Sequence, residues 1–264
     1  MADVKGTNSV TTGMTGNAGS TGGAGSAVRT GITRRDVVRH SAVLGTVTLV
    51  GGGSVLALPA GAVAAERPGP GDAPKRPTSP NGWELEEKAN DVSTVWTRPV
   101  PGTGLDVDVR IGDVETVLVH VVRRFHYEID ELRKGDLTGW RAPARVKPKR
   151  AEGNQASGTA VAIRPGSYPP GARGGFFPPQ LMVIRDILAE CDGVVRWGGD
   201  DDRPYEALFS IDVPPGDKRL TDLVAKLRTW ADEPGAGPGT QVDVADAKRR
   251  KAATALERRQ KETA

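Results

Sequence analysis

Two hydrophobic periods follow one another along the chain after residue 82, and together they predict a domain of the α+β class. Apolar and polar residues alternate, as in half-buried strands, over four segments: 105–111, 159–164, 194–197 and 207–213. Apolar residues recur every three to four positions, as on one face of a helix, over three longer segments: 113–132, 178–191 and 220–230. The predicted domain therefore spans residues 82–231.

The predicted helices begin with residue types that favour helix starts. Asp113 is a candidate N-cap for the first helix, and Pro178 and Pro179 suit the first turn of the second. The single cysteine, Cys191, falls on the apolar stripe of this second helix. We therefore interpret Cys191 as a small buried residue and not as a reactive thiol.

The region before the domain has the order of an export signal. Arg34 and Arg35 precede an uncharged stretch over 41–65 that ends in small residues, and we expect cleavage after Ala64 or Ala65. This order resembles a twin-arginine (Tat) signal peptide. The resemblance implies passage through the Tat translocon and an extracellular or cell-wall location, with no stable membrane span after cleavage. The alternative is a retained transmembrane helix, because the stretch is long enough to cross a bilayer.

Three further segments lack the apolar periodicity of a core. Residues 1–30 are rich in Gly, Ser and Thr and are expected to be disordered ahead of the signal. Residues 66–81 are rich in proline and predict a stiff linker. Residues 232–264 are expected to form a charged, flexible tail, in which 241–264 is a solvated and partly frayed helix rather than a binding arm.

The charge balance argues against a nucleic-acid partner. The chain of 264 residues has 36 Lys and Arg against 33 Asp and Glu, a formal net charge of +3. The segment over 1–65 holds five of the basic and two of the acidic residues, so its removal leaves 31 of each sign. The excess of positive charge therefore belongs to the predicted signal, and a neutral mature chain gives little support to nucleic-acid binding.

The composition also limits metal sites. One Cys and three His exclude a cysteine-rich zinc site. His120 and His126 lie six positions apart on the predicted helix and so on different sides of it. We interpret both as ordinary packing or surface residues.

Four separated segments occur in the order found in a known family: Asn154–Ala162 (NQASGTAVA), Arg185–Leu188 (RDIL), Val194–Asp200 (VVRWGGD) and Phe209–Asp212 (FSID). They resemble the zinc D-alanyl-D-alanine carboxypeptidases, the VanY-like peptidases of the Hedgehog/DD-peptidase fold. The similarity runs over about residues 85–230. It implies a small antiparallel sheet with packed helices and a peptidoglycan peptide as ligand.

In that family two His and one Asp hold zinc, and a carboxylate near the second His is the general base. The resemblance places these roles at Gln155, Ala162, Leu208 and Tyr205, in the order first His, Asp, second His and base. None of the four can perform its role, because an amide oxygen is a poor zinc ligand and the Ala and Leu side chains have no lone pair. Zinc is thus expected for the family but is not supported here.

Strand alternation predicts which face of the sheet Ala162 and Leu208 occupy. Ala162 falls opposite the face of Val161 and Ile163, and Leu208 falls on the face of Ser210 and Asp212. We expect Ala162 and Leu208 to line the cleft, together with Gln155 and Tyr205. An alignment shifted by one residue would instead bring Glu206 or Asp212 into the site, but it supplies no histidine.

Three functions remain open. The first is an exported pseudopeptidase, without catalytic residues, that binds cell-wall peptide or an envelope protein. Its candidate ligand-binding residues are Asn154, Arg164, Arg173, Arg196 and Asp212. The second is a peptidoglycan hydrolase that uses a hard cation and carboxylates, drawn from Asp200, Asp201, Asp202, Glu206 and Asp212. The third is an envelope protein whose binding surface lies elsewhere.

Overall fold

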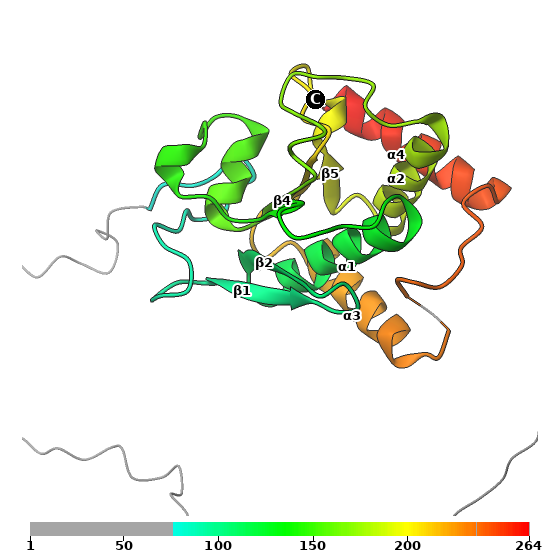
Figure 1. Ribbon diagram of the computed structural model, residues 1–264, viewed down its shortest axis with the longest axis horizontal. Coiled ribbons are helices and arrows are strands. Elements are labelled where there is room, and N and C mark those ends of the chain that lie inside the picture. The colour runs from blue at the N-terminus through cyan, green and yellow to red at the C-terminus, as the bar shows by residue number, and fades with distance from the viewer. Residues whose placement is uncertain (1–75, 236, 264) are drawn as a thin grey trace, which may run out of the picture. The chain divides into compact units, whose positions relative to one another are not determined.

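The computed structural model describes residues 76–235 and 237–263 (Figure 1). The predicted Tat signal with Arg34 and Arg35, its cleavage site and residues 66–75 of the predicted linker lie outside these residues. In the described ranges no helix is both long and apolar enough to cross a membrane.

The described elements follow one another in this order: β1 (Val95–Val100), β2 (Leu105–Arg110), α1 (Asp113–Glu128), β3 (Leu137–Thr138), η1 (Pro143–Arg145), η2 (Ala151–Ser157), β4 (Ala160–Ile163), α2 (Pro178–Glu190), β5 (Val195–Trp197), η3 (Gly198–Asp200), β6 (Leu208–Ile211), α3 (Lys218–Asp232) and α4 (Ala247–Glu262). Elements labelled η are short 3-10 helices. Every predicted strand and helix is confirmed, with ends that differ by a few residues.

The strands form two antiparallel sheets. β1 and β2 make a hairpin in which Val95 pairs with Arg110 and Val100 pairs with Leu105. The other four strands lie in the order β3-β4-β6-β5, and each neighbouring pair is antiparallel. The predicted α+β class with a small antiparallel sheet is therefore confirmed at this level.

Helix α1 follows the predicted apolar stripe but is shorter than expected. Its N-cap is Gly112, at a φ of 92°, and not Asp113, which is the first helical residue. The Glu115 carboxylate accepts a hydrogen bond from the Gly112 amide at 3.3 Å and closes the first turn. The helix ends at Glu128, and the Leu132 amide then donates to Nδ1 of His126 at 3.0 Å. This bond turns the chain back where the periodicity alone predicts more helix.

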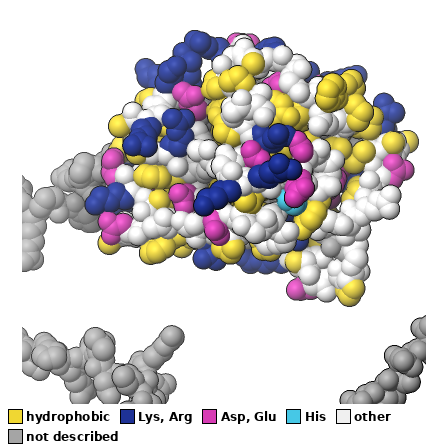
Figure 2. Space-filling view, viewed as in Figure 1, with side chains coloured by type: hydrophobic (Ala, Val, Ile, Leu, Met, Phe, Trp, Pro, Cys, Tyr) yellow, Lys and Arg dark blue, Asp and Glu magenta, His cyan; other side chains and the backbone are white. Residues whose placement is uncertain are grey.

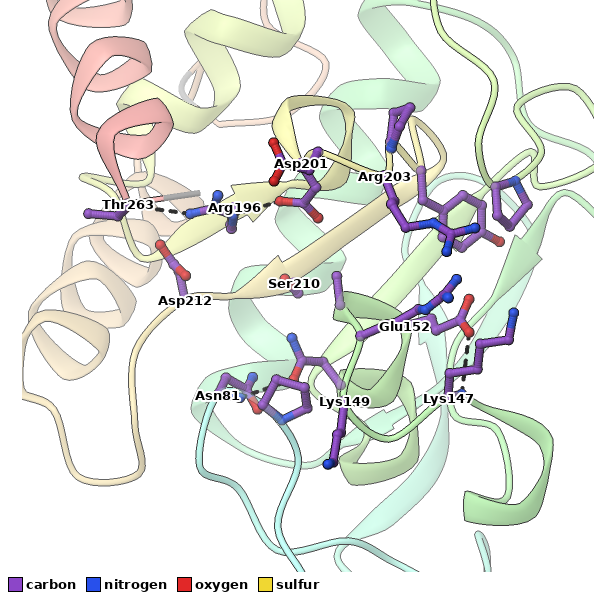
Figure 3. A pocket seen from close by; sticks show the side chains of 18 of the residues that line it. Asn81, Lys147, Lys149, Glu152, Arg196, Asp201, Arg203, Ser210, Asp212 and Thr263 are labelled. Atoms are coloured by element: carbon purple, nitrogen blue, oxygen red, sulfur yellow. Dashed lines mark hydrogen bonds and ion pairs between the residues drawn. The ribbon is translucent and has the colours of Figure 1, made fainter.

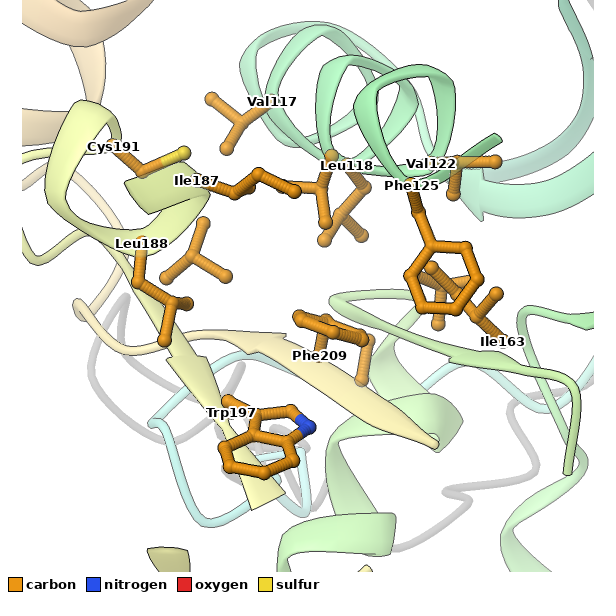
Figure 4. Close-up of a cluster of buried hydrophobic side chains, with 14 of the residues drawn as sticks. Val117, Leu118, Val122, Phe125, Ile163, Ile187, Leu188, Cys191, Trp197 and Phe209 are labelled. Carbon is orange, nitrogen blue, oxygen red and sulfur yellow. The ribbon is translucent and has the colours of Figure 1, made fainter. Parts of the chain in front are cut away.

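The main core lies between the helices and one face of the four-stranded sheet (Figure 4). Phe125 of α1 meets Phe209 of β6 edge to face, with ring centroids 6.3 Å apart. Ile163, on β4, and Cys191, directly after α2, are fully buried with them. Cys191 is thus the small buried residue that the sequence predicts, and burial raises the pKa of its thiol to about 12.

A cluster of buried charges joins α1, α2 and α4. Arg124, only 2% exposed, donates to Glu128 at 2.6 Å and to Glu190 at 2.6 Å, and it lies 3.0 Å from Asp186. Arg249 of α4 donates to both oxygens of Asp186 at 2.7 and 2.6 Å. Burial alone would raise the pKa of Glu190, but a hydrogen bond with His120 and the charge of Arg124 lower it to about 2.

Helix α4 corrects the expectation of a flexible tail over 232–264. Asp246 caps the helix by accepting from the amides of Lys248 and Arg249, both at 3.0 Å. Ala253, Leu256 and Gln260 are buried against the domain. Figure 1 draws α4 in red beside α2. The sequence pattern misses this packing because the buried side is narrow and includes the polar residues Arg249 and Gln260.

Residues between the predicted elements also hold structure that the pattern misses. β1 is buried only at its two ends, so its sequence shows no regular alternation. β3 and all but the last residue of η2 lie within 134–156, a polar and basic stretch whose sequence predicts a loop. The domain begins before Gly82, because Thr78 pairs with Glu84 and Ser79 is buried. Figure 2 shows basic and acidic side chains interspersed on the face in view.

The charge cluster predicts an asymmetric response to two Asp substitutions. Asp186→Ala leaves Arg124 and Arg249 without their shared carboxylate, so we expect a loss of about 3 kcal/mol in the free energy of unfolding. Asp222→Ala, which breaks the exposed pair with Lys218, serves as control and should cost less than about 1 kcal/mol. Urea unfolding of both variants measures the difference. Equal losses would mean that the cluster adds nothing to stability.

Candidate functional site

A pocket of about 980 Å³ opens on the face of the four-stranded sheet that lies away from Phe209 (Figure 3). Its floor includes Ser210 of β6 and Arg196 of β5, which are cross-strand partners. Successive side chains of a strand point to opposite faces, so Phe209 enters the core while Ser210 faces the pocket. The volume suits a small molecule or a short peptide.

One side of the pocket holds several aspartates and a single arginine. Arg196 donates to Asp201 at 3.1 Å and reaches the Thr263 hydroxyl at 3.4 Å. Asp212 lies on the same side in Figure 3, and within the described residues its carboxylate has no ion-pair partner. Asp202 also lines the pocket and is exposed. This side therefore presents three carboxylates, and among the described residues only that of Asp201 is in an ion pair.

The pocket raises the pKa of two of these carboxyl groups. For Asp212 the largest cause is loss of solvent around the group, and the charge of Asp201 adds to it while Arg196 and Arg219 oppose it. For Asp201 loss of solvent again leads, and the hydrogen bond and charge of Arg196 oppose it. Asp201 and Asp212 are thus harder to ionise than a free aspartate.

The opposite side of the pocket is basic. Lys147, Lys149 and Arg150 come from the segment between η1 and η2, and Arg203 comes from the loop before β6. Among the described residues none of these four forms an ion pair, although Glu152 lies close enough to accept from the Lys147 amide at 3.3 Å. Figure 3 places Lys147 and Lys149 across the pocket from Asp212. The pocket is therefore bipolar.

Two neutral groups complete the walls. Tyr205 lines the pocket and is largely buried, and burial raises the pKa of its phenol. Asn154 also lines it and accepts a hydrogen bond from the Asn81 amide at 3.2 Å. The Asn81 side chain donates to Thr159 at 2.8 Å and to the Ile211 carbonyl at 2.9 Å. Asn81 therefore fastens the entering chain to β4 and β6.

Ala162 and Leu208 correct the expectation of side chains that look into the cleft. They are cross-strand partners on one sheet face, as the alternation predicts, but both are fully buried and neither lines the pocket. The reason is close packing by the start of η3: a Cβ placed on Gly198 would lie 3.3 Å from the Leu208 Cβ. The start of η3 therefore covers Leu208 and keeps its side chain out of the pocket.

Gln155 is likewise buried and does not line the pocket. Its amide nitrogen donates to the carbonyls of Thr138 at 3.0 Å and Gly139 at 2.9 Å, while its Oε1 has no partner within the described residues. The side chain thus holds β3 in place. Gln155, Ala162 and Leu208 together do not fit zinc, because they offer one amide oxygen and two hydrocarbon groups.

Of the predicted ligand-binding residues, Asn154, Arg196 and Asp212 lie together in the pocket, and Arg164 does not. Arg164 has a φ of 52°, which breaks the strand alternation, and it pairs with Asp130 away from the pocket. Arg173 donates to the Gly199 and Asp201 carbonyls at 3.3 and 2.7 Å and so braces the loop beside the pocket.

Two of the five carboxylates of the hydrolase alternative are engaged outside the pocket, whereas Asp201, Asp202 and Asp212 line it. Asp200 pairs with Arg185, and Glu206 accepts from the amides of Gly174 and Gly175 at 2.7 and 2.8 Å. Within residues 76–235 and 237–263, no three His, Cys, Asp or Glu side chains gather closely enough to hold a metal ion.

Comparisons with known proteins identify no relative of this chain. No family model, curated protein or solved structure matches the chain. The site therefore has to be interpreted from its own residues. Sequence reasoning misses the basic side, although residues 141–150 carry five Lys and Arg and no acid, because composition alone does not show that the segment borders a pocket.

The environment of Asp212 predicts the direction of two pKa changes. In a ¹³C NMR titration the Asp212 carboxyl should titrate above its ordinary value of 3.8. Arg196→Ala should raise this pKa further by removing a stabilising positive charge, and Asp201→Asn should lower it by removing a repelling negative charge. Asp222→Asn, on α3, is the control and should leave it unchanged. Shifts in the opposite directions would contradict the electrostatic account.

Proposed function

We propose that the chain is a non-hydrolytic binding protein whose pocket takes a short peptide bearing both a carboxylate and an amino group. The observation that carries this proposal is the bipolar pocket, in which Lys147 and Lys149 lie across from Asp212 and none of the three forms an ion pair among the described residues. A ligand with one charge of each sign can satisfy both sides at once. A ligand of a single sign leaves one side desolvated without a partner.

The basic side suits a peptide carboxylate. Arginine binds carboxylates through two parallel hydrogen bonds, and lysine adds a mobile charge. Since Lys147, Lys149 and Arg150 have no ion pairs within the described chain, a ligand carboxylate need not displace an existing partner. Asp212 suits an ammonium group, whose approach would relieve the cost of its own charge.

The residues at the family positions favour binding over hydrolysis. Peptide hydrolysis of the zinc type needs three metal ligands and a base, and Gln155, Ala162, Leu208 and Tyr205 do not supply them. The resemblance to D-alanyl-D-alanine carboxypeptidases suggests which peptide is bound. We therefore propose a peptidoglycan stem peptide, met outside the cytoplasm after export through the Tat-like signal, with an envelope protein presenting such a peptide as an alternative partner.

Binding of a synthetic peptidoglycan stem peptide to the full chain tests the proposal by calorimetry. Asp212→Asn and the pair Lys149→Ala/Arg150→Ala should each weaken binding about tenfold or more, because each removes a charge-assisted contact. Asp222→Asn and Lys134→Ala remove exposed charges outside the pocket and serve as matched controls.

Mass spectrometry of the same peptide after incubation, with and without added zinc, separates binding from hydrolysis. We expect intact peptide in both cases. Cleavage together with stoichiometric zinc would replace the proposal with a peptidase. Binding that survives both pocket variants and Tyr205→Phe would move the binding surface away from this pocket.

A further inference from the structure

Helix α4 presents one side to the domain and the other to solvent. The docked side consists of Arg249, Ala253, Leu256 and Gln260, whose spacing of four, three and four residues places them on one face. Arg249 binds Asp186, and the Gln260 amide donates to the Val195 carbonyl at 2.8 Å. These contacts at both ends fix which side of the helix faces outward.

The outward side is strongly basic. Five of its cations form no ion pair among the described residues: Lys248, Arg250, Lys251, Arg258 and Arg259. The whole helix carries seven basic and two acidic residues, whereas the rest of the described chain carries 22 basic and 27 acidic ones. Helix α4 therefore has a net charge of +5, whereas the rest of the described chain has a net charge of −5.

The side chains between the cations are small. Ala247, Thr254 and Ala255 leave a shallow hollow of about 470 Å³ bordered by Arg250, Lys251 and Arg258. Arg258 lies eight positions after Arg250, which is about 12 Å along the helix axis. Such a row of charges fits an extended anionic chain that passes several phosphates along the helix.

The composition of this face limits the classes of partner that it can bind. It has no large apolar residue, which an amphipathic helix needs to enter a membrane interface. It has no aromatic residue for stacking on bases, which single-stranded nucleic acids need for tight binding. The features that remain are positive charge and a shallow hollow.

We propose that the outward face of α4 is a docking surface for a linear phosphate polymer without bases, bound through its backbone charge. The surface is separate from the peptide pocket and does not depend on the function proposed for it. It would hold the protein on such a polymer while the pocket stays available.

Linear inorganic polyphosphate is the probe, titrated against the full chain at several salt concentrations. The triple variant Arg250→Ala/Lys251→Ala/Arg258→Ala should bind polyphosphate about a hundredfold more weakly at low salt. Each of the three removed cations is expected to contribute a factor of about ten or less to the affinity. Its log–log salt slope should fall by about two, because three fewer phosphates are neutralised. Arg249 is untouched, so circular dichroism should report an unchanged fold.

A matched triple variant, Arg133→Ala/Lys134→Ala/Arg145→Ala, removes the same charge from exposed positions outside both α4 and the pocket and should retain nearly full affinity. Equal losses in the two triple variants would overturn the proposal in favour of general charge attraction. So would tighter binding to duplex DNA of equal phosphate number, to vesicles of phosphatidylglycerol, or the absence of polyphosphate binding.

Discussion

The antiparallel pairing of β4 with β6 decides which side chains build the core and which reach the pocket. Ala160 pairs with Ser210 and Ala162 with Leu208, so the residues between them, Val161 and Phe209, point to the helices. A slip of one residue would exchange the two faces and bring Phe209 to the pocket side. The packing of Phe209 on Phe125 therefore fixes Ser210, and with it Arg196, beneath the pocket.

The buried charges extend this order to the C-terminal helix. Arg124 is too deeply buried to remain unpaired, and its partners Asp186 and Glu190 also bind Arg249. One network thus satisfies a buried guanidinium and docks a helix that has little apolar surface of its own. The same docking brings Thr263 to the pocket rim beside Arg196. Stability of the core and shape of the pocket are therefore linked through α4.

Periodicity predicts the parts of the fold that have one buried face. β2, α1 and β6 carry clear patterns because their buried residues alternate or recur regularly. Periodicity does not predict β1 and η2, because their buried positions are few or irregularly spaced. Ala162 and Leu208 show a further limit: alternation gives the correct sheet face, but only the close approach of Gly198 decides that this part of the face is covered.

The same limit applies to the candidate site. Arg196 and Asp212 could be placed from strand alternation, whereas Arg164 could not, because its left-handed backbone turns it toward Asp130. Lys149 and Arg150 reach the pocket from a segment with no periodicity, so only the fold reveals them.

The pocket and the outward face of α4 differ in how they present charge. The pocket holds charges of both signs at fixed positions on one concave surface, whereas α4 holds a row of cations that face solvent and are screened within a Debye length. A ligand of the pocket would therefore have to match the arrangement of its charges, whereas a partner of α4 would have to match mainly their number.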